Sequence, residues 1–365
     1  MYQSGKTLHP GFLLLGAATA VLLFAAPRTC AAALQQGLRL CGGPLLVSLF
    51  PFLVVSALIM CSGAGGVLGI LFWPVVRCIG LRSRSAGSVL LIGFVGGFAP
   101  AAAAAAQAVR SGELTPQEAA ALLPACICSG PSFVILTVGE QMLHSRTAGV
   151  CLFAAQVLAG WLTAAVLYRI RGRAERQPLP QPIAPQKETP PALDGILAQA
   201  AVTYLKLCGF VLYFRLLAAG CGLLLPAALA PFPAMLLEVC SGCDYASRTG
   251  LWASGLCCAA LSVQGASVLL QVRTICPPEI SFRPLLWGRL VHLPLSLALF
   301  YLGLPEDAAE TFSTLCARVV PMQRVPTDCA LLVFAVCCIT ACEACRLNAA
   351  APKGCGKQKR QNALK

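Results

Sequence analysis

Glu238 is the most chemically suggestive residue of this 365-residue chain, because it is a carboxylic acid in a segment that is otherwise apolar. Ser241 and Gly242 follow it within about one helical turn. A carboxylate at membrane depth is unfavourable unless it is partnered, so such a residue is by default a candidate for binding a solute or a proton. A carboxylate is equally suited to capping the N-terminus of a helix. The sequence leaves both interpretations of Glu238 open.

Gln264, Ser267 and Gln271 supply the amide and hydroxyl groups of a second polar segment. Their i, i+3, i+7 spacing predicts that they share one face of a helix. Two amides on one face can donate and accept hydrogen bonds, which would suit a neutral polar solute. Amide and small residues also hold helices together in any membrane bundle, which is the plainer interpretation of each residue alone. Their position beside the glycine of S-V-Q-G-A-S keeps them as candidates for a binding site.

The first half of the chain has two breaks that match these in order. Gly97 and Pro100 interrupt one apolar segment, and Ser129, Gly130 and Ser132 surround a proline in the next. That proline removes one backbone donor, so the carbonyl groups it frees must find a partner in a hydroxyl group or a ligand. Paired broken helices in two halves of a membrane protein indicate a binding site near the middle of the bilayer.

The elements that position these residues are predicted from composition. The chain is 58% hydrophobic and 11% charged, with a mean hydropathy of +0.77. Several runs, such as 44–76 and 147–168, contain no charged residue and are long enough for a spanning helix of about 20 residues. They lack the alternation of β-barrel strands. We therefore expect an all-α polytopic membrane protein with about eight to ten apolar helices. The shorter segment 11–26 is expected as a retained first helix rather than a signal peptide.

The net charge of +13 comes from basic residues that cluster in short loops and a tail, which is the pattern of cytoplasmic segments. Because no basic groove with interleaved aromatic residues accompanies them, nucleic acid is not an expected partner. A proline-rich linker separates two halves of similar length. The predicted units are a first membrane half at 1–170, the linker at 171–193, a second membrane half at 194–347 and a basic tail at 348–365.

The basic loops also predict which segments fail to cross the membrane. The loops at 77–84 and 169–176 should both be cytoplasmic, yet three apolar stretches lie between them. One stretch must therefore be re-entrant, and 86–109 is the candidate because glycines and a proline break it. The same reasoning predicts a second re-entrant piece after the linker. It is marked by Pro226, Pro231, Pro233 and Gly242.

Two further patterns are expected to be structural. Thr115 and Glu118 have the spacing of a capping box, which predicts that a helix begins there. Lys206 and Arg215 interrupt the first helix of the second half, and they do not share a face because they lie nine residues apart. We expect both side chains to extend to the membrane interface.

The 21 cysteines are interpreted as small hydrophobic residues, because many of them lie within apolar runs. Only three histidines are present, so a structural zinc site is not expected. Phosphate-binding, dinucleotide-binding and hydrolase motifs are absent from the sequence. We therefore expect no enzymatic activity, no metal and no cofactor.

Six runs, taken in order, resemble a known family. They are Leu49–Leu58, Gly96–Pro100, Arg110–Ala119, Cys128–Phe133, Leu237–Gly242 and Ser262–Gln271. Together they resemble the sporulation integral membrane proteins of the YlbJ type, over residues 40 to 302. That family belongs to the nucleoside-recognition, or gate-domain, group and is related in fold to halves of concentrative nucleoside transporters. Gly130 stands where the family often has an asparagine.

The resemblance implies a multi-pass protein of the bacterial inner membrane that binds or translocates a small polar, nucleoside-like solute during spore formation. The alternative is a membrane scaffold without transport that is needed for spore assembly. The expected partners are the lipid bilayer and the solute, and a homo-oligomer is compatible with either function. The candidate substrate-binding residues are Gly97, Pro100, Ser129, Gly130, Ser132, Glu238, Ser241, Gly242, Gln264, Ser267 and Gln271.

Overall fold

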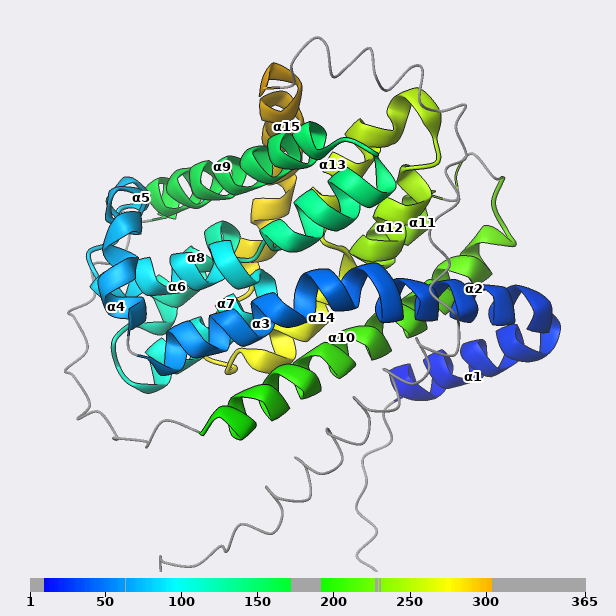
Figure 1. Ribbon diagram of the computed structural model, residues 1–365, viewed down its shortest axis with the longest axis horizontal. Helices are drawn as coiled ribbons and strands as arrows, with labels where there is room; N and C mark the ends of the chain where they lie inside the picture. Colours follow the sequence, from blue (N-terminus) through cyan, green and yellow to red (C-terminus); the bar gives the residue numbers. More distant parts are fainter. Residues whose placement is uncertain (1–9, 63, 172–191, 227–228, 230, 304–365) are drawn as a thin grey trace, which may run out of the picture.

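The computed structural model describes residues 10–62, 64–171, 192–226, 229 and 231–303 (Figure 1). Every element in these ranges is helical. The chain is therefore an all-α protein, as the composition predicted. The linker at 172–191, the segment after 303 and the basic tail within it lie outside the described residues.

The first half begins with a long helical segment and continues through shorter pieces. Its elements are α1 (Pro10–Ala25), α2 (Pro27–Leu40), the π-helical η1 (Cys41–Leu45), α3 (Leu46–Cys61), α4 (Ala64–Leu68), η2 (Gly69–Phe72), α5 (Trp73–Ile79), α6 (Arg84–Gly96), α7 (Phe98–Arg110), α8 (Pro116–Cys126), the π-helical η3 (Ser132–Met142) and α9 (Arg146–Arg171). The second half has α10 (Leu193–Gly222), α11 (Pro231–Leu237), α12 (Val239–Ala246), η5 (Gly250–Trp252), α13 (Ala253–Val263), α14 (Gly265–Ile275) and α15 (Arg283–Gly303).

Five helical segments of the described chain are long and apolar enough to cross a membrane. A sixth is added if the helices on either side of a 108° bend, Gly66–Ile79 and Arg84–Gly96, count as one span. This makes the chain a multi-pass membrane protein. The expectation of eight to ten apolar helices covers the whole chain, and part of it, including the apolar run 329–342, lies outside the described residues. The five segments are Pro27–Cys61, Arg146–Ile170, Leu193–Gly222, Gly250–Ile275 and Arg283–Gly303.

The long helices enclose the short ones. In Figure 1, α10 passes across α3 on one side of the bundle, and it packs on both α2 and α3. On the other side, α9 packs on α8, η3 and α15. The half-helices α6, α7, α8, α12, α13 and α14 lie between these two groups.

The first of two hairpins is formed by α6 and α7. A Cβ atom on Gly93 would lie 3.2 Å from the Cβ atom of Ala101. The two residues are eight positions apart, which would separate them by about 12 Å along a continuous helix. The chain therefore folds back between them, at Gly97, whose φ of +79° is readily available only to glycine. This is the stretch for which a re-entrant path was predicted.

The second hairpin is formed by α11 and α12. A Cβ atom on Gly242 would lie 2.8 Å from the Cα atom of Met235. Seven positions of continuous helix would separate these residues by about 10 Å, so the chain folds back at Glu238. This hairpin lies in the region where the second re-entrant piece was predicted.

The other two breaks interrupt longer helical paths. Between α8 and η3 the chain leaves the helical path at residues 127–130. Between α13 and α14, Gln264 adopts a left-handed conformation with a φ of +66°, and the φ of Gly265 after it is +70°. Ahead of α8, the Thr115 hydroxyl accepts a hydrogen bond from the Glu118 amide and the Glu118 carboxylate accepts one from the Thr115 amide, both at 3.0 Å. The predicted capping box is thus confirmed.

In each half, the residue at which the hairpin turns lies against the other interruption of the helical path in that half. A Cβ atom on Gly97 would lie 2.8 Å from the backbone nitrogen of Gly130, and one on Gly265 would lie 2.9 Å from the backbone nitrogen of Glu238. Both glycines have positive φ angles. The backbones can approach this closely because one residue of each contact, Gly97 or Gly265, carries no side chain.

Replacing either contact glycine by alanine should therefore destabilise the protein. Gly97→Ala and Gly265→Ala each combine an alanine at a positive φ angle with a clash against backbone, for which we expect a cost of about 2–4 kcal/mol and a lower melting temperature. Gly209→Ala is the matched control, because a Cβ atom at this exposed helical glycine would meet nothing within 4 Å. Thermal unfolding in detergent compares the three. Equal melting temperatures would contradict the close approach of the backbones.

Candidate functional site

Glu238 caps α12. Its carboxylate accepts hydrogen bonds from the backbone amides of Cys240 at 2.8 Å and Ser241 at 2.6 Å. The side chain is buried, with a residue exposure of 1%. In the described part of the chain no basic side chain forms an ion pair with it, so its charge is balanced by the positive end of the α12 dipole. Of the two interpretations of Glu238, the helix cap is the one that the geometry shows.

Gln264 connects the two halves. Its side-chain amide donates to the Ser129 hydroxyl at 3.3 Å and to the carbonyl of Leu261 at 2.7 Å. Because Gln264 has left-handed backbone angles and precedes α14, it does not continue the helical face of Ser267 and Gln271. The expectation that all three share one face is wrong for this reason. Gln271 instead donates to Ser267 at 3.1 Å within α14.

The contacts bring five of the candidate residues together with Gly265 at one place, which we call the junction. Gly97 touches Gly130, Ser129 binds Gln264, and Gly265 touches Glu238. The junction therefore consists of Gly97, Ser129, Gly130, Glu238, Gln264 and Gly265. All four chain breaks meet there, two from each half.

The remaining candidates lie close to the junction in sequence. Pro100 is half-buried in the first turn of α7, and its ring would lie 2.9 Å from a Cβ atom on Gly96. Ser132 opens η3 and Ser241 lies in the first turn of α12. Both serines are buried.

Three polar atoms at or beside the junction are buried and have no hydrogen-bond partner within the described chain. They are the hydroxyls of Ser132 and Ser241 and the amide oxygen of Gln264. Buried polar groups in proteins are almost always satisfied, so each such atom calls for an explanation. A ligand that carries both donors and acceptors could satisfy all three atoms.

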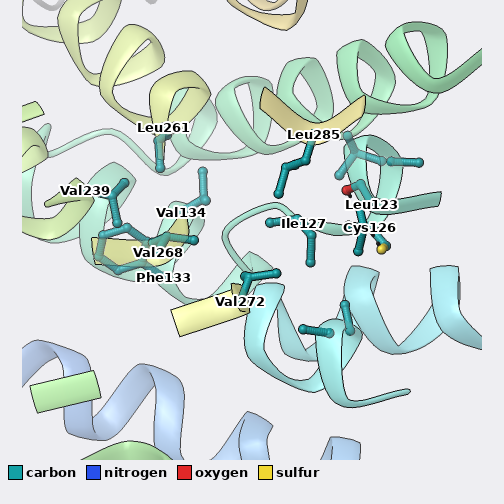
Figure 2. Close-up of a cluster of buried hydrophobic side chains, with 14 of the residues drawn as sticks. Leu123, Cys126, Ile127, Phe133, Val134, Val239, Leu261, Val268, Val272 and Leu285 are labelled. Atoms are coloured by element: carbon teal, nitrogen blue, oxygen red, sulfur yellow. Dashed lines mark hydrogen bonds between the residues drawn. The ribbon is translucent and has the colours of Figure 1, made fainter. Parts of the chain in front are cut away.

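Buried apolar side chains from both halves lie within a few sequence positions of these polar residues. Figure 2 shows Phe133 and Val134 of η3 beside Val239 of α12 and Val268 of α14, with Leu261 of α13 close by. All five side chains are buried. Polar groups in such a low-dielectric environment interact strongly with any partner that reaches them.

A buried polar network behind the junction escaped the sequence analysis. Gln156 of α9 donates to the Ser262 hydroxyl at 3.0 Å, and the hydroxyls of Ser262 and Ser296 lie 2.5 Å apart. His292 of α15 contacts the backbone carbonyl of Gln156 at 3.0 Å, and the buried Arg289 lies one turn before it. The i, i+3, i+7 spacing of Arg289, His292 and Ser296 within an apolar helix is the signal that could have found them.

The placement of Arg215 shows that the expectation for this residue was wrong. Lys206 is exposed, but Arg215 has an exposure of 0% and does not extend to an interface. It pairs with Asp244 of α12 at 2.5 Å and donates to Gln36 of α2 at 2.8 Å. Asp244 also accepts from Arg248 at 2.7 Å. The partner Asp244 is distant in sequence, so only packing could reveal it.

Comparison with known proteins finds no family model that matches the chain, and no curated protein or solved structure that matches it. What the junction can do is therefore inferred from its own residues.

Removing Asp244 should be strongly destabilising. Asp244→Leu leaves Arg215 buried without its counter-charge, and we expect a loss of about 3–5 kcal/mol. Arg248→Ala should cost no more than about 1 kcal/mol, because the Arg248 side chain is 61% exposed and water screens its interaction. Replacing both partners, in Arg215→Leu with Asp244→Leu, should restore much of the melting temperature lost in the single variant. A double variant no more stable than Asp244→Leu would contradict the role of the ion pair.

Proposed function

We propose that the protein binds a small, neutral polar solute at the junction and moves it across the membrane between its two halves. The observation that carries this proposal is the meeting of four chain breaks, two from each half, beside three buried polar atoms that have no hydrogen-bond partner among the described residues. Broken helices at such a place release backbone groups that can bind a solute. A bundle held together only by apolar packing has no use for such breaks, because each interior glycine costs a helix about 1 kcal/mol.

The chemistry of the junction favours an uncharged solute. The two nearby charges are both engaged by the protein, Glu238 by the N-terminus of α12 and Arg289 by backbone carbonyls. The unpaired groups are hydroxyls and an amide oxygen, which match hydroxyl and amide groups on a ligand. The apolar side chains of Phe133, Val239 and Val268 would cover its less polar surface.

The narrower parts of the proposal rest on the resemblance to sporulation membrane proteins. A nucleoside-like solute has hydroxyl and amide groups on a compact ring system, so it agrees with the groups at the junction. The role in spore formation and the location in a bacterial inner membrane are supported by the resemblance alone.

One observation favours the alternative, a membrane scaffold without transport. Gln264 already joins the two halves through Ser129, and the Glu238 carboxylate is occupied by two backbone amides. A scaffold with these internal bonds would hold its halves in a fixed arrangement. The experiment below separates the two functions, because a scaffold has no reason to bind a nucleoside.

The test compares ligand binding with stability. Nucleosides should raise the melting temperature of the purified protein, and radiolabelled uridine should enter proteoliposomes that contain it. Ser132→Ala with Ser241→Ala should abolish the ligand-induced shift and the uptake. The same double variant should not lower the melting temperature without ligand, because it removes buried hydroxyls that have no hydrogen-bond partner in the described part of the chain.

Thr163→Val is the matched control, because it also removes a buried hydroxyl that no described residue hydrogen-bonds, but on α9, outside the residues of the junction. This variant should bind and transport as the native protein does. Absence of any nucleoside effect on the native protein, or an equal loss in the Thr163 variant, would argue for the scaffold.

A further inference from the structure

Arg289 is a buried cation in a helix that is apolar enough to span a membrane. It lies on α15 with an exposure of 9%. In the described part of the chain no carboxylate forms an ion pair with it. An isolated charge in this environment is highly unfavourable, so another group must balance it.

Two backbone carbonyls balance this charge. The Arg289 guanidinium donates to the carbonyl of Ile127 at 2.6 Å through Nη2 and to that of Ser262 at 3.3 Å through Nη1. Ile127 is the residue at which α8 ends, and Ser262 lies in the last turn of α13. The last carbonyls of a helix have no partner within the helix and carry its negative dipole end. The negative ends of two half-helices, one from each half of the chain, therefore converge on one guanidinium group.

Carbonyls at the ends of broken helices are the ligands that membrane proteins use for small monovalent cations. We infer that the carbonyls of Ile127 and Ser262 form a monovalent-cation site that the chain fills with its own Arg289 side chain. This tethered cation joins the break of the first half to the break of the second. It supplies permanently the positive charge that a free ion would supply only when bound.

The packing of α15 fits this assignment. A Cβ atom on Gly288 would lie 3.4 Å from side-chain atoms of Pro124 and Thr163, so α15 can approach α8 and α9 closely one residue before Arg289. One turn later, His292 contacts the backbone carbonyl of Gln156 at 3.0 Å. These contacts hold the guanidinium between the two helix ends.

A consequence that rests on the proposed function concerns the driving ion. If solute moves through the junction, a sodium gradient cannot drive it through this site, because Arg289 already occupies the carbonyls. The structural inference itself does not depend on transport, and the experiment below uses no solute.

Chemical rescue tests the inference. Arg289→Ala should lower the melting temperature and leave a space shaped for a guanidinium group. Millimolar ethylguanidinium should then raise the melting temperature of this variant by about 2–4 °C relative to choline at equal ionic strength, because it binds only the folded state. Sodium and potassium should give smaller increases. The native protein should respond to none of these cations more than to choline.

Leu285→Ala is the matched control, because it removes a fully buried side chain of the same helix one turn away without touching the carbonyls. Ethylguanidinium should not rescue it. Failure to rescue Arg289→Ala, or equal rescue of Leu285→Ala, would overturn the inference.

A second pair of variants serves if Arg289→Ala cannot be purified. Arg289→Lys keeps the positive charge, whereas Arg289→Met fills a similar volume with an uncharged side chain. The lysine variant should melt at a higher temperature than the methionine variant, because only a cation balances the carbonyls. Equal melting temperatures, or a more stable methionine variant, would show that Arg289 acts by packing alone.

Discussion

The structure depends on one constraint: a helix that breaks inside an apolar environment leaves backbone groups that water cannot satisfy. In this chain, buried charged side chains satisfy several of these backbone groups. The Glu238 carboxylate takes two free amides at the start of α12, and the Arg289 guanidinium takes carbonyls at the ends of α8 and α13. An anion at a helix start and a cation at two helix ends are the arrangements that the helix dipole favours. The buried charges are thus part of how the breaks are tolerated.

The same contacts explain why the breaks lie together rather than apart. Each hairpin tip meets the break of its own half through glycine, at Gly97 with Gly130 and at Gly265 with Glu238. The two halves are then joined by a few polar bonds, from Gln264 to Ser129 and from Arg289 to the carbonyls of both halves. A small number of directional bonds in an apolar setting can define one arrangement of the halves.

The placement of Arg215 shows a different use of charge. Its partner, Asp244, lies on α12, the half-helix whose other end is capped by Glu238. One short helix is therefore fixed at its start by a carboxylate and near its end by an ion pair with α10. A half-helix of eight residues has little stability of its own, so these tertiary contacts are what keep it helical.

The all-α membrane class, the capping box at Thr115 and the regions of the breaks follow from the sequence, because composition, cap residues and glycine act over a few neighbouring positions. Tertiary structure alone decided which breaks touch, that Gln264 leaves the helical face of Gln271, and that Arg215 turns inward to Asp244. It also placed Arg289 on carbonyls from both halves. These outcomes depend on residues far apart in the chain, and a buried charge reveals its partner only when packing brings the two together.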